Sequence, residues 1–225
     1  MNNKEINVIF DMDGVILDSE KACLSTWSEA AAKYGIPNVR EVFEKCIGTN
    51  KYQTRQIVKD AYTKDFGEGI EDKLLKESSA LFHERYDDGK IPLKEGVFEI
   101  LDFLKEKGIK TGLASSTALK TVERELTEAG VIDYFDMVIG GDSVTISKPN
   151  PEIYLLACEK MGVKPEDTYA IEDSFNGIRS AKAAGMRPLM VPDIIPANEE
   201  MVKLSEVICR DLFDTIDYLN SVLEG

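Results

Sequence analysis

Two closely spaced pairs of carboxylates in this sequence each follow a short apolar run. Asp11 and Asp13 come directly after EINVIF, and Glu172 and Asp173 come directly after TYAI. Residues two apart on an extended loop point the same way, so Asp11 and Asp13 can face one cleft. Such close carboxylates repel each other unless a proton or a cation separates them, and Mg²⁺ prefers oxygen ligands of this kind. We therefore predict a Mg²⁺ site here. The simpler interpretation is that the first pair stabilises a turn and that the second pair stabilises the start of a helix.

Hydroxyl and ammonium groups that could bind phosphate occur at two further places. Ser115 and Ser116, in LASST, end an apolar run and precede a helical pattern, where a hydroxyl and backbone N–H groups can hold phosphate oxygens. A serine at this place is also a common helix N-cap, and the two interpretations are compatible. Lys148 lies in SKPNPEIY, where Pro149 and Pro151 stiffen the chain and fix where the amine points. Its charge could neutralise a phosphate and a nearby nucleophile.

The elements that must position these groups follow from the hydrophobic periodicity. EINVIF is a short β-branched run, typical of a strand buried on both faces of a parallel sheet. Residues 19–88 carry only helical spacing, whereas after Pro92 helical and strand patterns alternate as far as residues 187–191. This alternation implies right-handed crossovers and a parallel sheet. We predict an α/β protein with a Rossmann-like core of residues 1–18 and 89–225, helices on both faces of its sheet, and an inserted all-helical cap of residues 19–88.

The polar groups singled out above share one edge of the predicted sheet. Asp11, Ser115, Lys148 and the pair Glu172 and Asp173 each lie just beyond the carboxyl end of a predicted strand or in the loop that follows it. In open α/β sheets this edge binds the ligand. Their arrival from four separate strands favours a catalytic site over four unrelated, solvated loops.

Four segments in chain order, DMDGVILDSE, LASS, SKPNPEIY and IEDSFNGI, resemble the four motifs of the haloacid dehalogenase-like superfamily. The resemblance covers nearly the whole chain. The motif spacing and the helical insertion after the first motif are similar to the subgroup that contains beta-phosphoglucomutases and related sugar-phosphate phosphatases. The resemblance implies an enzyme that transfers the phosphoryl group of a small phosphorylated metabolite.

The resemblance also implies a role for each matching residue. Asp11 would be the nucleophile that attacks phosphorus, and Asp13 the acid that protonates the leaving oxygen and later activates water. Ser115 and Lys148 would hold the transferring phosphoryl group, which completes the catalytic set. Family members that cleave carbon–halogen or carbon–phosphorus bonds lack a carboxylate at the position of Asp13, so its presence favours phosphate esters.

A bound Mg²⁺ is the cofactor that this resemblance implies. Its ligands would be the Asp11 carboxylate, the Asp13 backbone carbonyl and Asp173, with Glu172 as a further ligand or a neighbour of the ligands. Phosphoryl transfer needs mainly positioning and neutralisation of oxygen charge, which Mg²⁺, Lys148 and backbone amides can supply.

The predicted cap is expected to select the substrate and to exclude water. Cys23 occupies the place of a histidine that the mutases use to return the phosphoryl group to the sugar, and a cap lysine of theirs has no clear match. We therefore predict a Mg²⁺-dependent phosphatase that hydrolyses a small phosphomonoester, such as a sugar phosphate, through an aspartyl-phosphate, with a phosphosugar mutase as the alternative. Trp27, at helical spacing, also fits a packing role. The same resemblance implies that Trp27 and the loop Gly48, Thr49, Asn50 and Lys51 fall where the mutases contact their sugar. Together with Ser116 they are the predicted substrate-binding residues.

The composition argues against some classes of binding partner and indicates the cellular compartment. The 225-residue chain has a net charge of −14, which argues against nucleic acid or an acidic membrane surface as a partner. No segment approaches the roughly 18 apolar residues of a membrane span, and the N-terminal residues show no signal pattern, so we expect a cytoplasmic protein that acts as a monomer. The four cysteines lie far apart, and the lone His83 cannot complete a zinc site with them.

Two other classes of protein share part of this pattern. A phosphorylation-activated receiver domain also forms an aspartyl-phosphate beside paired acids, but it is much shorter and carries the phosphorylated aspartate after a middle strand. A protein that only binds a phosphorylated metabolite would need the cleft but not Asp11, Asp13, Lys148 and Asp173 together. The complete set favours catalysis, and turnover of a phosphomonoester would separate the three classes.

Overall fold

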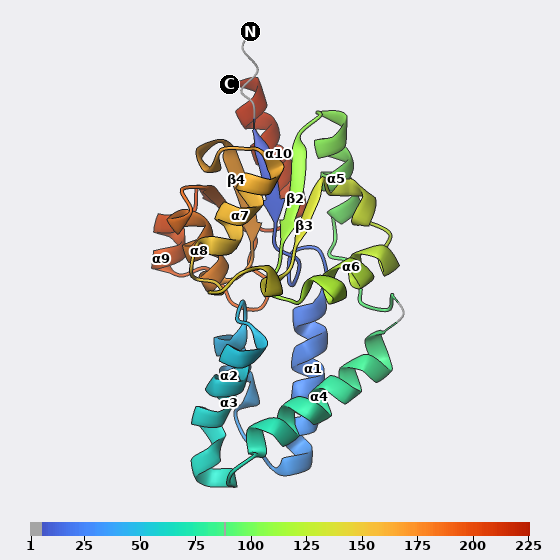
Figure 1. Ribbon diagram of the computed structural model, residues 1–225, viewed down its shortest axis with the longest axis vertical. Helices are drawn as coiled ribbons and strands as arrows, with labels where there is room; N and C mark the ends of the chain where they lie inside the picture. Colours follow the sequence, from blue (N-terminus) through green and yellow to red (C-terminus); the bar gives the residue numbers. More distant parts are fainter. Residues whose placement is uncertain (1–5, 88) are drawn as a thin grey trace.

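One sheet of six parallel strands forms the centre of the protein (Figure 1). The structure is a computed structural model that describes residues 6–87 and 89–225. The strand order is β3-β2-β1-β4-β5-β6. The strands are β1 (Asn7–Phe10), β2 (Lys110–Ala114), β3 (Met137–Ile139), β4 (Thr168–Glu172), β5 (Arg187–Met190) and β6 (Val207–Ile208). The predicted Rossmann-like sheet is confirmed, and the short β6 is an addition to the predicted strands.

Helices cover both faces of this sheet because successive side chains of a strand point to opposite sides. Val8 and Phe10 of β1 belong to one hydrophobic layer, and Ile9 belongs to the other. The helices of the first layer are α5 (Val97–Glu106), α6 (Leu119–Glu128) and α10 (Leu212–Glu224). Those of the second are α7 (Glu152–Met161) and α8 (Phe175–Ala183), with α9 (Glu199–Leu204) packed beside α8.

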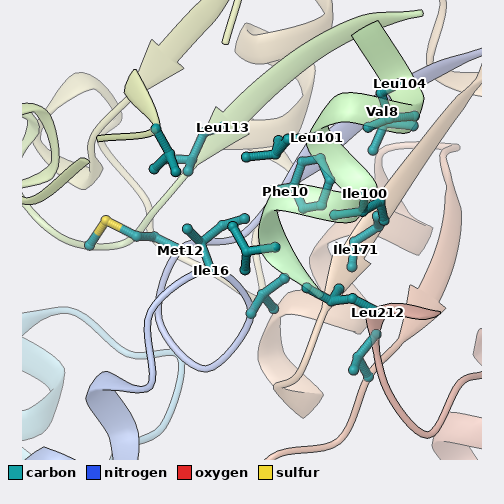
Figure 2. Close-up of a cluster of buried hydrophobic side chains, with 14 of the residues drawn as sticks. Val8, Phe10, Met12, Ile16, Ile100, Leu101, Leu104, Leu113, Ile171 and Leu212 are labelled. Carbon is teal, nitrogen blue, oxygen red and sulfur yellow. The ribbon is translucent and has the colours of Figure 1, made fainter. Parts of the chain in front are cut away.

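The first layer also holds the loop that follows β1. Figure 2 shows Met12 and Ile16 from this loop in the same cluster as Phe10 and Leu113 from the strands and Ile100 from α5. All of these side chains are fully buried. Each such burial contributes about 1.5–3 kcal/mol relative to exposure. The core therefore holds this loop in place. The side chains on either side of Met12, those of Asp11 and Asp13, point away from the hydrophobic layer.

Four further helices lie beyond the carboxyl edge of the sheet, at the opposite end of the molecule from the end of α10 (Figure 1). They are α1 (Ser19–Tyr34), α2 (Val39–Cys46), α3 (Lys51–Phe66) and α4 (Ile70–Tyr86). We call these four helices the cap. They share a hydrophobic cluster of their own. The predicted insertion ends at residue 88, which lies outside the described residues, as do residues 1–5 of the predicted core.

The two chain crossings between the sheet and the cap lie side by side. Leu17 and Leu93 form an antiparallel bridge, and the backbone N–H of Asp18 donates to the carbonyl of Pro92 over 2.8 Å. Paired short crossings of this kind can act as a hinge. Within the described residues, no helix combines the length and apolar content that crossing a membrane requires.

Candidate active site

The strand order places the predicted catalytic residues at the centre of one sheet edge. β1 lies between β2 and β4, so the loops that leave these three strands meet at the point where the strand order reverses. Asp11 follows β1, Ser115 follows β2, and Glu172 and Asp173 lie at the end of β4. Ligands of open α/β sheets bind at this reversal. The convergence expected from the sequence is therefore present.

Lys148 reaches this edge from the loop before α7 and connects two of the carboxylates. Its Nζ donates to Asp11 Oδ1 over 2.6 Å, to Glu172 Oε1 over 2.7 Å and to the carbonyl of Ala114 over 3.1 Å. The side chain is only 1% exposed. Burial lowers the pKa of Lys148, but the charges of Asp11 and Glu172 outweigh burial and hold this pKa above its ordinary value. The ammonium group is therefore a fixed positive charge beside Asp11.

Glu172 is held in place by three partners. The hydroxyl of Tyr154 donates to Oε1 over 2.7 Å, and the hydroxyl of Ser174 donates to Oε2 over 3.0 Å, in addition to the bond from Lys148. A Cβ atom at Gly177 would overlap the Glu172 carboxylate, so glycine allows α8 to begin this close to β4. Tyr154 was missed from the sequence, although it lies within SKPNPEIY, the segment that contains Lys148.

Asp13 accepts two hydroxyl hydrogen bonds at the entrance to the site. Ser19 Oγ donates to Oδ1 over 2.6 Å, and Thr117 Oγ1 donates to Oδ2 over 3.1 Å. Ser115, which is fully buried, accepts at its Oγ from the backbone N–H of Thr117 over 3.0 Å. Thr117 therefore links the loop after β2 to Asp13. Its only signal in the sequence is its place two residues after Ser115.

The buried carboxylates fit a divalent cation. One carboxylate oxygen from each of Asp11, Glu172 and Asp173 lies within 4.8 Å of the others. Burial, together with the neighbouring acids, raises the pKa of Asp11 to about 7 although Lys148 opposes this, and burial followed by Glu20 and Glu172 raises the pKa of Asp173 well above its ordinary value. Lys148 balances part of this charge, and a hard divalent cation would balance more of it.

A small cavity of about 80 Å³ lies between this edge and the cap. Glu20, in the first turn of α1, forms part of its wall and was missed from the sequence. Burial and the nearby Asp13 carboxylate raise the pKa of Glu20 well above its ordinary value. The residues around the cavity are Asp11, Asp13, Glu20, Cys46, Gly48, Thr49, Ser116, Thr117 and Asp173. Three of the predicted substrate-binding residues, Gly48, Thr49 and Ser116, are thus brought to the site.

The cap touches the core around this cavity. Ser116 Oγ donates to the carbonyl of Gly48 over 3.4 Å. A Cβ atom at Gly48 would lie 2.6 Å from Ser174 Oγ, so only glycine fits this approach without movement. The Asn50 side-chain amide donates to Ser147 Oγ. The structure therefore shows the cap closed on the core.

The other predicted substrate-binding residues lie away from the cavity wall. Trp27 is 7% exposed in the cap cluster and meets Phe43 edge to face, with 5.1 Å between the ring centroids. Asn50 caps the N-terminus of α3 in a capping box with Gln53. Lys51 is exposed at the start of the same helix. A substrate role for these three residues remains a prediction.

Comparison with known proteins identifies the family. The family model described as haloacid dehalogenase-like hydrolase matches residues 8–191. The chain belongs to this family. Its similarity to the phosphorylated carbohydrates phosphatase of Thermotoga maritima is 36% identity over 182 residues, 80% of this chain and 81% of that protein. The predicted enzyme class, a phosphoric monoester hydrolase of the haloacid dehalogenase-like family, is confirmed.

Two further relatives link the family to phosphorylated sugars. The beta-phosphoglucomutase of Bacillus subtilis is 31% identical over 188 residues, 80% of each chain. A solved structure of a variant of protein CbbY from Rhodobacter sphaeroides, in complex with xylulose-(1,5)bisphosphate, has a TM-score of 0.73 and 27% identity, and the similarity covers 91% of this chain and 93% of that one. The haloacid dehalogenase-like hydrolase therefore has relatives of both the phosphatase and the mutase kind.

Proposed function

We propose that this hydrolase is a Mg²⁺-dependent phosphatase that cleaves a small sugar or sugar-alcohol phosphate through an aspartyl-phosphate on Asp11. The observation that carries the proposal is the pairing of the Asp11 carboxylate with the buried ammonium of Lys148 at 2.6 Å, beside a cluster of carboxylates at the sheet edge. A carboxylate becomes an effective nucleophile toward a phosphate ester only when the negative charges of both groups are neutralised.

The residues divide the reaction between them. Asp11 attacks phosphorus with one carboxylate oxygen, the bond from phosphorus to the leaving oxygen breaks, and an acyl phosphate forms on Asp11. Asp13 gives a proton to the leaving oxygen and then takes one from the water that hydrolyses the acyl phosphate. Its bonds from Ser19 and Thr117 hold the carboxylate at the entrance of the site, where the leaving group departs. Lys148 and the hydroxyl of Ser115 hold the phosphoryl oxygens.

The metal ligands in this proposal are the Asp11 carboxylate, the Asp13 backbone carbonyl and Asp173. When bound, Mg²⁺ would neutralise charge on the phosphoryl oxygens and on the nucleophile. Glu172 belongs to the same cluster, but its bonds from Lys148, Tyr154 and Ser174 favour a role in orienting the lysine.

The cavity wall supports a neutral, hydroxylated leaving group. Asp13 and Glu20 line this cavity, and their carboxyl groups can exchange hydrogen bonds with sugar hydroxyls but offer no positive charge to a substrate that carries its own carboxylate. The cavity of about 80 Å³ is well below the roughly 300–1,000 Å³ of typical ligand pockets. The cap must therefore move away from the core to admit a sugar phosphate.

Phosphate release with Mg²⁺ across a panel of phosphomonoesters tests this proposal. Sugar and sugar-alcohol phosphates are expected to be hydrolysed faster than phosphoglycolate or nucleotides. The mutase alternative, which the similarity to beta-phosphoglucomutase supports, is tested in parallel by isomerisation of beta-glucose 1-phosphate. Cys23 stands where the mutases have a histidine, so we expect phosphate release to dominate; isomerisation without net release would establish the mutase instead.

Glu20→Gln tests the hydroxyl contact. The change should raise KM for the best sugar phosphate by about tenfold, because the amide cannot reproduce the hydrogen bonds that the carboxyl group of Glu20 makes with the sugar hydroxyls. Turnover of phenyl phosphate, which has no hydroxyl groups on its leaving group, should change by less than about twofold. Glu29→Gln on the exposed side of α1 is the matched control. An equal loss of activity with both substrates would show that Glu20 does not bind the sugar hydroxyls.

A further inference from the structure

The loop that leaves β5 connects the core to the cap by apolar contact. Ile194 and Ile195 of this loop pack against the hydrophobic cluster of the cap, although the loop belongs to the core in sequence and connects β5 to α9. We call residues 192–196 the strap. The cluster that the strap joins includes Trp27 and Ala30 of α1. The strap is thus a core segment that packs against the cap.

Asp193 adds an ion pair to this apolar contact. Its Oδ1 lies 3.0 Å from Lys21 Nζ, on the first turn of α1, and 2.6 Å from Lys94 Nζ, just after the second chain crossing. Asp18, at the first crossing, lies 3.1 Å from the same Lys21 amine. The Asp193 side chain is only 2% exposed, and its Oδ2 atom has no hydrogen-bond partner among the described residues. The two lysines therefore neutralise the buried negative charge of Asp193.

We propose that the Lys21–Asp193 pair is a latch between core and cap, which holds the first turn of α1, and with it Glu20, over the catalytic edge. Lys21 and Glu20 are neighbours on one helical turn, so a lysine fixed to the core also fixes the carboxylate beside it. Lys94 keeps Asp193 in position from the core side, while Lys21 is the member that moves with the cap. Opening the cap separates Lys21 from Asp193, and Ile194 and Ile195 from the cap cluster.

Cys46 reports cap opening without any substrate. This thiol lies at the end of α2, lines the cavity between cap and core, and is 8% exposed. Burial raises the pKa of Cys46 to about 12, so the thiol reacts slowly while the cap is closed. Cys46 belongs to the cap cluster, and the cavity between cap and core is the side from which opening would expose it. Alkylation at slightly alkaline pH, with the Cys46 peptide quantified by mass spectrometry, therefore compares how readily the cap opens in each variant. Lys21 is 58% exposed and Lys94 still pairs with Asp193 at 2.6 Å, so substitutions of Lys21 should leave the protein folded, which thermal unfolding checks.

Three variants of the full chain decide the proposal. Lys21→Gln should increase the rate of Cys46 alkylation by about two- to fivefold, the range that a partly exposed ion pair supports. Lys21→Arg keeps the charge and should react at the parental rate. Lys33→Gln is the matched control, because Lys33 is equally exposed on α1 but pairs with Glu77 inside the cap at 2.7 Å. Added salt should speed alkylation of the parent and of Lys33→Gln, but have less effect on Lys21→Gln.

An unchanged alkylation rate in Lys21→Gln, an equal increase in Lys33→Gln, or no rescue by arginine would overturn the latch. With the best sugar phosphate, Lys21→Gln should lower kcat/KM, because a smaller fraction of the bound complex has the closed cap that brings Glu20 to the sugar. The role given to Glu20 rests on the proposed function. Since the alkylation experiment needs no turnover, failure of the latch and failure of the proposed phosphatase give separate results.

Discussion

Asp11→Asn is expected to abolish phosphate release, with a loss of at least about a thousandfold in kcat, because an amide is close in shape to the carboxylate but is a poor nucleophile. The fold should survive. Burial already raises the pKa of Asp11 to about 7, so the carboxylate charge is costly in the metal-free protein, and Lys148 keeps its second partner, Glu172. The measurement is steady-state phosphate release with saturating Mg²⁺.

Asp217→Asn is the matched control for this experiment. Asp217 is exposed on α10, far in sequence from the motifs, and its substitution should leave turnover unchanged. Circular dichroism and thermal unfolding should show that both variants are folded. Activity of Asp11→Asn above about one per cent of the parent would mean that another group, or water itself, attacks phosphorus.

Removing Mg²⁺ with a chelator is expected to lower turnover by at least about a hundredfold, and adding Mg²⁺ back should restore it. The physical reason is the surplus of negative charge. One carboxylate oxygen from each of Asp11, Glu172 and Asp173 lies within 4.8 Å of the others, and a phosphate dianion must be added to them. Asp173→Asn should weaken the response to Mg²⁺. Full activity in the presence of chelator would remove the metal from the mechanism.

The same site should make the stabilisation by Mg²⁺ depend on pH. Burial raises the pKa of Asp11 to about 7 and that of Asp173 above its ordinary value, so the metal-free folded protein binds more protons than the unfolded chain between roughly pH 4 and pH 7. The contribution of these groups to stability therefore falls as pH rises through this window. Mg²⁺ must displace the same protons, so the increase in Tm that it causes should be larger at pH 8 than at pH 5.5.

Thermal unfolding of the parent and of Asp173→Asn, each with and without Mg²⁺ at both pH values, measures this effect. The parent should show the pH-dependent increase in Tm, and the variant should show little increase at either pH. An increase of the same size at pH 5.5 and pH 8 would place the bound ion away from these carboxylates.

Much of the fold follows from the sequence because its inner strands are buried on both faces. The apolar run before Asp11 and the run before Glu172 each contain enough β-branched residues to identify a strand, and the reactive residues directly follow them. β6 was missed because Val207 and Ile208 are too few to show a period. Its place is set by pairing with β5, which is a tertiary contact.

The candidate site was predictable where its residues come from the sheet and less so where they come from helices. Asp11, Ser115 and Asp173 are fixed by the strands that precede them. Glu20 and Trp27 lie on the same helix, and which of the two faces the core depends on how α1 packs against the strap and against its cap neighbours. Helical periodicity marks an apolar face but not the domain that this face meets. The sequence therefore indicated Trp27 as a pocket residue and did not indicate Glu20.

The most direct test of the central claim, transfer of the phosphoryl group through Asp11, is the stereochemistry at phosphorus. The best substrate of the panel, made isotopically chiral at phosphorus, is hydrolysed in isotopically labelled water, and the configuration of the released phosphate is determined. Two successive in-line displacements, first by Asp11 and then by water, predict overall retention of configuration. Inversion would show a single displacement by water and would contradict the aspartyl-phosphate.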